Sequence, residues 1–391
     1  MIYLDNAATT KVRREVLDEM LPYFSEYYTN PSSIYSPSRM VSKRVEEARK
    51  LIAGTIGAEA SEIYFTSGGS ESDNWAIKKI MISRMNKGKH MITTKVEHHA
   101  VLESCKYLES LGFEVTYLNV NEDGLIDLNE LENSIREDTI LVSIMAANNE
   151  IGTLMPLKEI GDICKKHKVL FHTDAVQAYG NIPIDVNEMN IDLLSTSAHK
   201  IEGPKGIGFL YVRKGVMITP LISGGMQEKG KRAGTTNAPG IIGFAKACEL
   251  KFSEMEKNNE YVLNLREHLI DRVLSEIPYV RLNGSRDKRL VGNANFSFQF
   301  IEGEGMLLKL DALGICASSG SACTSGSLDP SHVLLAIGLP HEIAHGSLRL
   351  TMNHENTMEE IDYTVDKLKE VISGLRSMSP LYEDFIKKGS N

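Results

Sequence analysis

From about residue 39 to residue 250, apolar residues alternate between two kinds of spacing. Val41, Val45, Ala48 and Ile52 are three or four positions apart, as on one face of a helix, and Gly57 follows soon afterwards. Short apolar runs typical of buried strands lie at 63–65, 91–93, 140–144, 169–171 and 193–194, mostly with helical patterns between them. Apolar strands separated by helices predict a mostly parallel sheet that is covered by helices on both faces.

The pattern changes after Glu249. A long charged helix is predicted over residues 250–274, and residues 296–300 and 348–352 then alternate between apolar and polar side chains, as strands do. This arrangement indicates a smaller α+β domain, to which the first residues of the chain also contribute. We therefore predict a large α/β domain over residues 14–250 and a small domain formed by residues 1–13 and 251–391.

The composition is that of an ordinary globular protein. The 391 residues are 42% hydrophobic and 24% charged, which is enough for two domains with their own cores. The net charge of -9 argues against non-specific binding to nucleic acid. Because the N-terminus does not resemble a signal peptide and no apolar run approaches membrane-spanning length, we expect a cytoplasmic protein without membrane association.

The five cysteines, at positions 105, 164, 248, 316 and 323, are widely spaced and odd in number, which argues against a disulfide framework. No Cys-x-x-Cys pair is present and His98-His99 lacks the spacing of a zinc pair, so no metal site is predicted. Cys323 differs from the other four, because residues 317–327 contain no large side chain that could anchor them. An exposed thiol there is a candidate nucleophile, although an incidental loop cysteine gives the same pattern.

Polar residues follow several predicted strands, and their order suggests a cofactor. Residues 67–72 place two glycines and several hydroxyls before a helix, which favours a phosphate there, although an ordinary helix cap has the same pattern. Asp174 and Gln177 follow the strand at 169–171, and residues 197–200, Ser-Ala-His-Lys, follow the strand at 193–194. Pyridoxal phosphate needs an amine for its aldehyde and a carboxylate for its ring nitrogen, and Lys200 and Asp174 fit these two roles.

Arg349 alternates with Leu348 and Leu350, so its side chain is expected on the opposite face of the strand from the two leucines. A guanidinium in that position can hold a carboxylate through two hydrogen bonds. A structural ion pair explains the same residue and, for Arg349 taken alone, is the better supported of the two explanations.

Taken together, these segments closely resemble the NifS/IscS family of cysteine desulfurases, which are class V aminotransferase-like, pyridoxal phosphate-dependent enzymes. The resemblance extends over nearly the whole chain, and the loop around Cys323 resembles the long loop of this branch. The matching motifs, in chain order, are residues 3–10, 66–74, 97–101, 148–152, 172–177, 197–200, 232–235 and 319–325.

The resemblance implies a fold-type I pyridoxal phosphate enzyme and assigns roles to particular residues. Lys200 would form the Schiff base, Asp174 would pair with the ring nitrogen, and Gln177 would bond the phenolic oxygen. His98 would stack on the ring, and Asn149 and Arg349 would orient the substrate carboxylate. The expected phosphate ligands are Gly69, Ser70, Ser197 and His199, with Thr235 from the partner subunit of a homodimer.

The implied reaction converts L-cysteine to L-alanine and leaves a persulfide on Cys323, with Lys200 moving the Cα proton. Iron–sulfur scaffold proteins or tRNA thiolation proteins would then accept the sulfur. Tyr35, Met226 and the Asn353-His354 pair depart from the family pattern. Tyr35 and Met226 motivate an alternative in which the same cofactor serves a selenocysteine lyase, a cystine C–S lyase or an aminotransferase. A third hypothesis is a catalytically idle scaffold protein.

Overall fold

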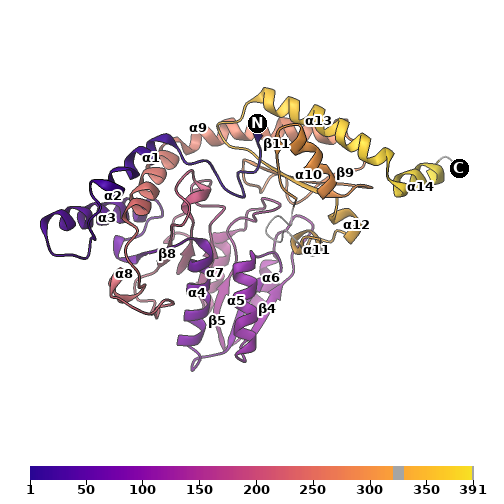
Figure 1. The fold of residues 1–391 in the computed structure, drawn as a ribbon. Coiled ribbons are helices and arrows are strands. Elements are labelled where there is room, and N and C mark those ends of the chain that lie inside the picture. The colour runs from indigo at the N-terminus through magenta and orange to yellow at the C-terminus, as the bar shows by residue number, and fades with distance from the viewer. Residues whose placement is uncertain (320–329, 390–391) are drawn as a thin grey trace.

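The computed structural model describes residues 1–319 and 330–389 (Figure 1). Its largest sheet has seven strands in the order β2-β8-β7-β6-β5-β3-β4. Their bounds are β2 (Ile63–Thr66), β3 (His90–Thr94), β4 (Glu114–Leu118), β5 (Thr139–Ser143), β6 (Leu170–Asp174), β7 (Leu193–Ser195) and β8 (Gly208–Val212). Strand β8 runs antiparallel to both of its neighbours, while the pairings among β4, β3, β5, β6 and β7 are parallel. The predicted mostly parallel sheet is therefore confirmed.

The sequence patterns did not predict two strands of this sheet. Strand β4 lies at the edge and carries Glu114 and Thr116 among its apolar residues, so it does not form a continuous apolar run. Strand β8 is buried along its whole length, but it follows a turn-rich segment rather than a helix. The pattern of strands alternating with helices fails here because β8 reverses direction and pairs with β7 directly.

Successive residues of the central strands enter different cores on the two faces of the sheet. Met91, Leu141 and Leu193 pack with α4 (Gly69–Ser83) and α5 (His99–Ser110). Ile92, Val142 and their neighbours on the other face pack with a second group of helices. That group is α3 (Ser36–Gly54), α6 (Leu128–Ser134), α7 (Leu157–His167) and part of α9 (Ala238–Glu276). Burial on both faces explains why the strands read as continuous apolar runs.

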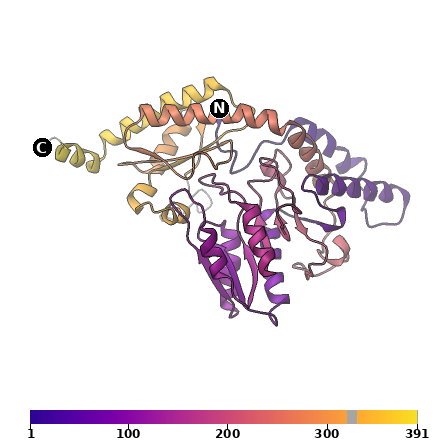
Figure 2. The same ribbon diagram turned by 180° about the vertical axis from the view of Figure 1, so that it is seen from behind.

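A third core belongs to the C-terminal part of the chain and includes Leu4. It packs around an antiparallel sheet of β12 (Ser347–Thr351), β10 (Asn293–Phe298) and β9 (Val280–Leu282). The remaining elements of this part are β1 (Ile2–Tyr3), β11 (Ile315–Cys316), α10 (Gly303–Ala312), α11 (His332–Ala336), α12 (His341–Ala344), α13 (Met358–Ser377) and α14 (Pro380–Gly389). Figure 2 shows this part above the large sheet from behind. None of the helices described is long and apolar enough to cross a membrane.

Helix α9 corrects the predicted helix over residues 250–274, because it begins at Ala238, twelve residues earlier. The side chain of Asn237 caps it by accepting a hydrogen bond from the Gly240 amide. Residues near Cys248 pack in the large core, and Val262, Leu265, Leu269, Ile270 and Val273 pack in the small one. Leu250 and Phe252 still pack against the large core, so the change after Glu249 is not the start of a helix, and the packing partner changes between Phe252 and Val262. We propose the domain division at residues 250/251, inside α9.

The predicted strand at 296–300 is also corrected, since β10 ends at Phe298 and all six of its residues are buried. Its polar residues are satisfied by hydrogen bonds, because the Asn283 amide donates to Asn295 Oδ1 and to Ser297 Oγ. Phe300 has a left-handed backbone with φ of 69° and packs against Phe385 of α14. The polar residues of β10 are therefore buried, although they alternate with apolar residues in the sequence.

Candidate active site

A cavity of about 270 Å³ opens at the carboxyl ends of β2, β3, β5, β6 and β7. Sites in parallel sheets gather at this edge, since the loops that follow the strands converge there. The cavity is lined by Ala7, Ala8, Gly69, Ser70, Asp73, His98, Met145, Ala147, Asn149, Asp174, Val176, Gln177, Ser197, His199, Lys200 and Arg349. Ten of the predicted site residues are in this set, whereas Thr235 is not and Cys323 lies outside the described residues.

The N-terminus of α4 forms one end of the cavity and is suited to an anion. Gly68 precedes it with φ of 149°, and no side chain caps the helix. A Cβ on Gly69 would lie 2.5 Å from Val176 Cγ2, so only glycine allows this close approach. Because uncapped N–H groups and the helix dipole both favour negative charge, a phosphate fits beside Ser70 and Ser197.

His199 lies next to this end of the cavity, and its Nδ1 is 3.1 Å from Thr9 Oγ1. Burial, together with the positive charges of Lys200 and Lys205, lowers the pKa of His199 to about 4. The imidazole is therefore neutral at physiological pH, so it meets an anion as a hydrogen-bonding group rather than as a cation.

Asp174 stands at the end of β6, and its Oδ1 accepts a hydrogen bond of 2.9 Å from the Val176 amide. Burial raises the pKa of this carboxyl, while the nearby His98 and Lys200 act in the opposite direction. His98 caps α5 and uses its Nδ1 to accept from the Ala100 amide at 3.1 Å. Since burial lowers the pKa of His98, its ring is neutral with the proton on Nε2.

Lys200 ends the short 3-10 helix η2 (Ala198–Lys200), which follows β7. Its Nζ donates to the carbonyl oxygens of Ala7 and Ala8 at 2.5 Å and 2.8 Å. The Gln177 amide also donates to the Ala7 oxygen, at 2.9 Å. The N-terminal segment is therefore a wall of the site, a role that sequence reasoning missed because it is played by backbone atoms.

Arg349 lines the cavity and is only 3% exposed. One terminal nitrogen donates to the Asn149 carbonyl oxygen and the other to Asp5 Oδ1, both at 2.9 Å. Leu348 and Leu350 pack in the small core, so the predicted opposite orientation of Arg349 is confirmed. The two explanations of this residue are compatible, since it forms an ion pair and also faces the cavity.

Thr235 is exposed in the segment between α8 (Gln227–Gly230) and α9 and does not reach the cavity of its own chain. Ion pairs hold both α8 and this segment. Arg232 contacts Glu71 of α4 at 2.9 Å, and Glu228 contacts Arg49 of α3 at 2.6 Å. Of the departures from the family pattern, Tyr35 and Met226 are exposed, and His354 contacts the buried Glu202 at 3.2 Å.

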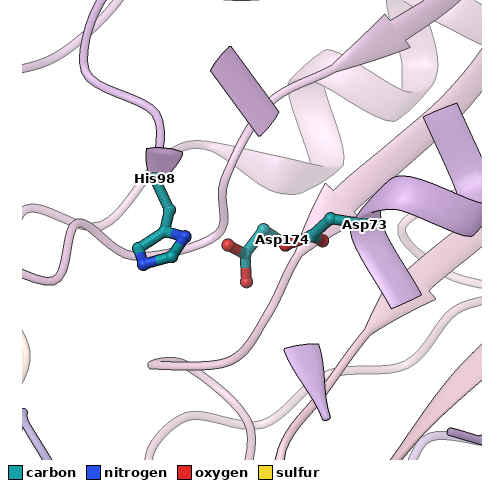
Figure 3. Close-up of side chains that lie close together, drawn as sticks. All are labelled: Asp73, His98 and Asp174. Carbon is teal, nitrogen blue, oxygen red and sulfur yellow. The ribbon is translucent and has the colours of Figure 1, made fainter. Parts of the chain in front are cut away.

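Asp73 is the acidic group that sequence reasoning missed, although it lies within the motif at residues 66–74. It projects from α4 and is 1% exposed. One ligand atom each of Asp73, His98 and Asp174 lies within 4.8 Å of the others, as Figure 3 illustrates. Only the spacing from Gly69, one helical turn earlier, could have indicated that Asp73 faces the same side of α4.

The residues of this cavity fit pyridoxal phosphate. The uncapped helix N-terminus suits its phosphate, the Asp174 carboxyl suits its ring nitrogen, and the Lys200 amine suits its aldehyde. All three groups line one cavity, as the sequence analysis predicted from their order alone.

Comparison with known proteins gives matches over nearly the whole chain. Residues 2–364 match the family model of aminotransferase class-V. A curated relative, cysteine desulfurase IscS of Methanosarcina thermophila, is 56% identical over 97% of this chain and 94% of its own. A solved NifS-like protein has a TM-score of 0.90 at 40% identity and covers 96% of this chain and 100% of its own. A structure of SspA in complex with cysteine has a TM-score of 0.80 at 38% identity, covering 91% and 100%.

Proposed function

The chain belongs to the aminotransferase class-V family as a pyridoxal phosphate-dependent cysteine desulfurase of the NifS/IscS type, and we propose that it stores the sulfur of L-cysteine as a persulfide on Cys323. The observation that carries this proposal is the single cavity in which Lys200, Asp174 and the uncapped N-terminus of α4 meet. The likeness to SspA in complex with cysteine supports the same substrate.

Each role in the proposal follows from the chemistry of one group. Bound pyridoxal phosphate supplies an electron sink that weakens the Cα–H bond of the substrate. Lys200 Nζ takes that proton and returns one to the product. The Asp174 carboxylate keeps the ring nitrogen protonated, and Gln177 donates to the phenolic oxygen. The neutral ring of His98 would stack on the cofactor, and Gly69, Ser70, Ser197 and His199 would hold its phosphate.

Cys323, outside the described residues, is proposed as the sulfur acceptor. Its thiolate attacks the substrate sulfur, an S–S bond forms, and the C–S bond of the substrate breaks. The electron pair of the broken bond stays with the carbon, which takes up a proton and leaves as alanine. The persulfide sulfur then passes to a partner protein, for which we propose an iron–sulfur scaffold or a tRNA thiolation protein in the cytoplasm.

An amino-acid panel tests the proposed function. With a reductant present, the purified enzyme is expected to form alanine and sulfide in equal amounts from L-cysteine. Selenocysteine, cystine and an amino donor with a keto-acid acceptor are assayed alongside. Faster turnover of one of these, or formation of a keto acid from L-cysteine, would contradict the proposal in favour of the matching alternative.

Arg349 is proposed to bind the substrate carboxylate together with Asn149. Replacing Arg349 with glutamine is expected to raise KM for L-cysteine about 30–100-fold, because a charge-assisted pair of hydrogen bonds is lost. Cofactor affinity, followed by fluorescence titration, is expected to stay within about threefold of the wild type. Asp5→Asn is the matched control, since it removes the ion pair and leaves the guanidinium. An equal rise in KM for both variants would show that the ion pair alone matters.

A homodimer is proposed because apolar side chains are exposed at one end of the molecule, formed by α1 (Arg14–Met20), α2 (Pro22–Ser25), α3 and the region before α8 (Figure 1). The exposed residues there include Leu21, Phe24, Tyr28, Ile34, Met217 and Met226. An apolar surface of this kind is typical of an interface. In a dimer, the exposed Thr235 of one subunit would reach the cofactor phosphate bound in the other subunit. Sedimentation velocity is expected to give twice the chain mass of 43.4 kDa. A monomer at micromolar concentration would refute the dimer.

A further inference from the structure

Asp73 is a buried carboxyl that the proposed reaction does not use. Its side chain lines the cavity behind Asp174, and Figure 3 shows His98 on the other side of Asp174. Its Oδ1 has no hydrogen-bond partner among the described residues. Because an ionised carboxylate without partners is costly to bury, the protonation state of Asp73 needs an explanation.

A short chain of polar side chains lies next to Asp73. Ser195 lowers the pKa of the Asp73 carboxyl, His172 Nε2 is 3.7 Å from Asp73 Oδ1, and Ser195 Oγ is 3.0 Å from the same His172 nitrogen. His172 Nδ1 is 2.8 Å from Ser143 Oγ. Burial lowers the pKa of His172 to about 3, so this ring is neutral and brings no positive charge to Asp73. These side chains therefore supply no positive charge that would stabilise an Asp73 carboxylate.

Asp174 lies in a different environment, although it is close by. Its Oδ1 accepts a hydrogen bond from the Val176 amide, and the positive charge of Lys200 stabilises its charged form. The titratable groups that face Asp73 are Asp174 and Glu97, which oppose its ionisation, and His172 and His98, whose rings are neutral. Two carboxyl groups this close in a buried site do not both ionise, and the less stabilised of the two keeps the proton.

We propose that Asp73 is a positioning residue that retains a proton, so that the single negative charge of the Asp73–Asp174 pair rests on Asp174. This proposal rests on the proposed function in one respect, which is that Asp174 pairs with the ring nitrogen of the cofactor. Burial and the charge of Asp174 raise the pKa of Asp73 well above that of an ordinary aspartate, in agreement with the geometry. Because Asp73 is neutral, the single negative charge of the pair lies on Asp174, the residue proposed to pair with the ring nitrogen of the cofactor.

Infrared spectroscopy of the cofactor-free protein tests where the proton resides. With ¹³C-labelled aspartate, the wild type at pH 7 is expected to show the C=O stretch of a protonated aspartic acid. Asp73→Asn is expected to remove this band, and Asp174→Asn is expected to keep it. Asp192→Asn is the control and is expected to leave the band unchanged, since Asp192 pairs with Arg213 at 3.2 Å. A wild type without the band, or a band lost in Asp174→Asn and kept in Asp73→Asn, would overturn the proposal.

Cofactor affinity as a function of pH tests the consequence. At pH 7, Asp73→Asn is expected to bind pyridoxal phosphate within about threefold of the wild type, because a neutral amide replaces a neutral acid. At alkaline pH, ionisation of Asp73 in the wild type adds negative charge that helps the ring nitrogen to keep its proton. The variant lacks this charge, so the alkaline limb of its affinity profile is expected about one pH unit lower.

A purely structural role of Asp73 would instead weaken affinity equally at all pH values, and that result would refute the proposal, as would an unchanged alkaline limb. Should Asp73→Asn fail to fold, a band that persists in Asp174→Asn still assigns the proton to Asp73, and a wild type without the band still refutes the proposal. If the wild type does not bind pyridoxal phosphate, the proposed function fails, whereas the infrared result on the cofactor-free protein stands by itself.

Discussion

Replacing Lys200 with alanine is expected to abolish the visible absorbance of the bound cofactor and to lower alanine formation by more than about 10⁴-fold. The amine is proposed both to bond the cofactor covalently and to move the Cα proton, so one substitution removes two functions. Absorbance spectra and an alanine assay measure the two losses separately. Lys205→Ala is the matched control, because Lys205 is an exposed lysine in the same loop.

Lys200→Arg separates chemistry from structure. Lys200 also donates to the Ala7 and Ala8 carbonyls, so its loss could disturb the N-terminal wall of the site. Arginine keeps the positive charge and the donors, but it cannot form an imine because it stays protonated. The arginine variant is therefore expected to be as inactive as the alanine variant. Substantial activity in either variant would refute the role of Lys200.

Replacing Cys323 with alanine is expected to reduce sulfide release from L-cysteine by more than about 10³-fold, because no other thiol is proposed to accept the sulfur. The cofactor spectrum and its change on adding cysteine are expected to persist, since the proposed cofactor ligands are untouched. Mass spectrometry of the wild type after a single turnover is expected to place one extra sulfur on the peptide that contains Cys323.

Cys316→Ala is the control for this experiment, because Cys316 is the other cysteine of the proposed small domain and lies in strand β11, where it pairs with Tyr3 of β1. Its loss is expected to leave the rate and the persulfide unchanged. Normal turnover by Cys323→Ala would refute the proposed role of Cys323, but it would not affect the roles proposed for the cofactor ligands.

Sequence patterns predicted the sheet and the main cavity well. Every strand expected in the large sheet is present, and the apolar runs reflect burial on both faces. Edge strand β4 and the reversed strand β8 did not follow the pattern, since the former is partly exposed and the latter is not preceded by a helix. The predicted helix was shorter than α9 because residues 238–249, about the first third of α9, were assigned to the large domain alone.

The sequence by itself determined the family and the chemical groups of the site, because both are carried by the ordered motifs around Asp174, Lys200 and Arg349 and by strand ends that bring them together. Only the tertiary structure decided that the backbone of Ala7 and Ala8 closes the site and that Asp73 stands beside Asp174. The physical reason is that backbone acceptors have no side-chain signature. The proton balance of two carboxyls likewise depends on their distance and burial, which no local pattern encodes.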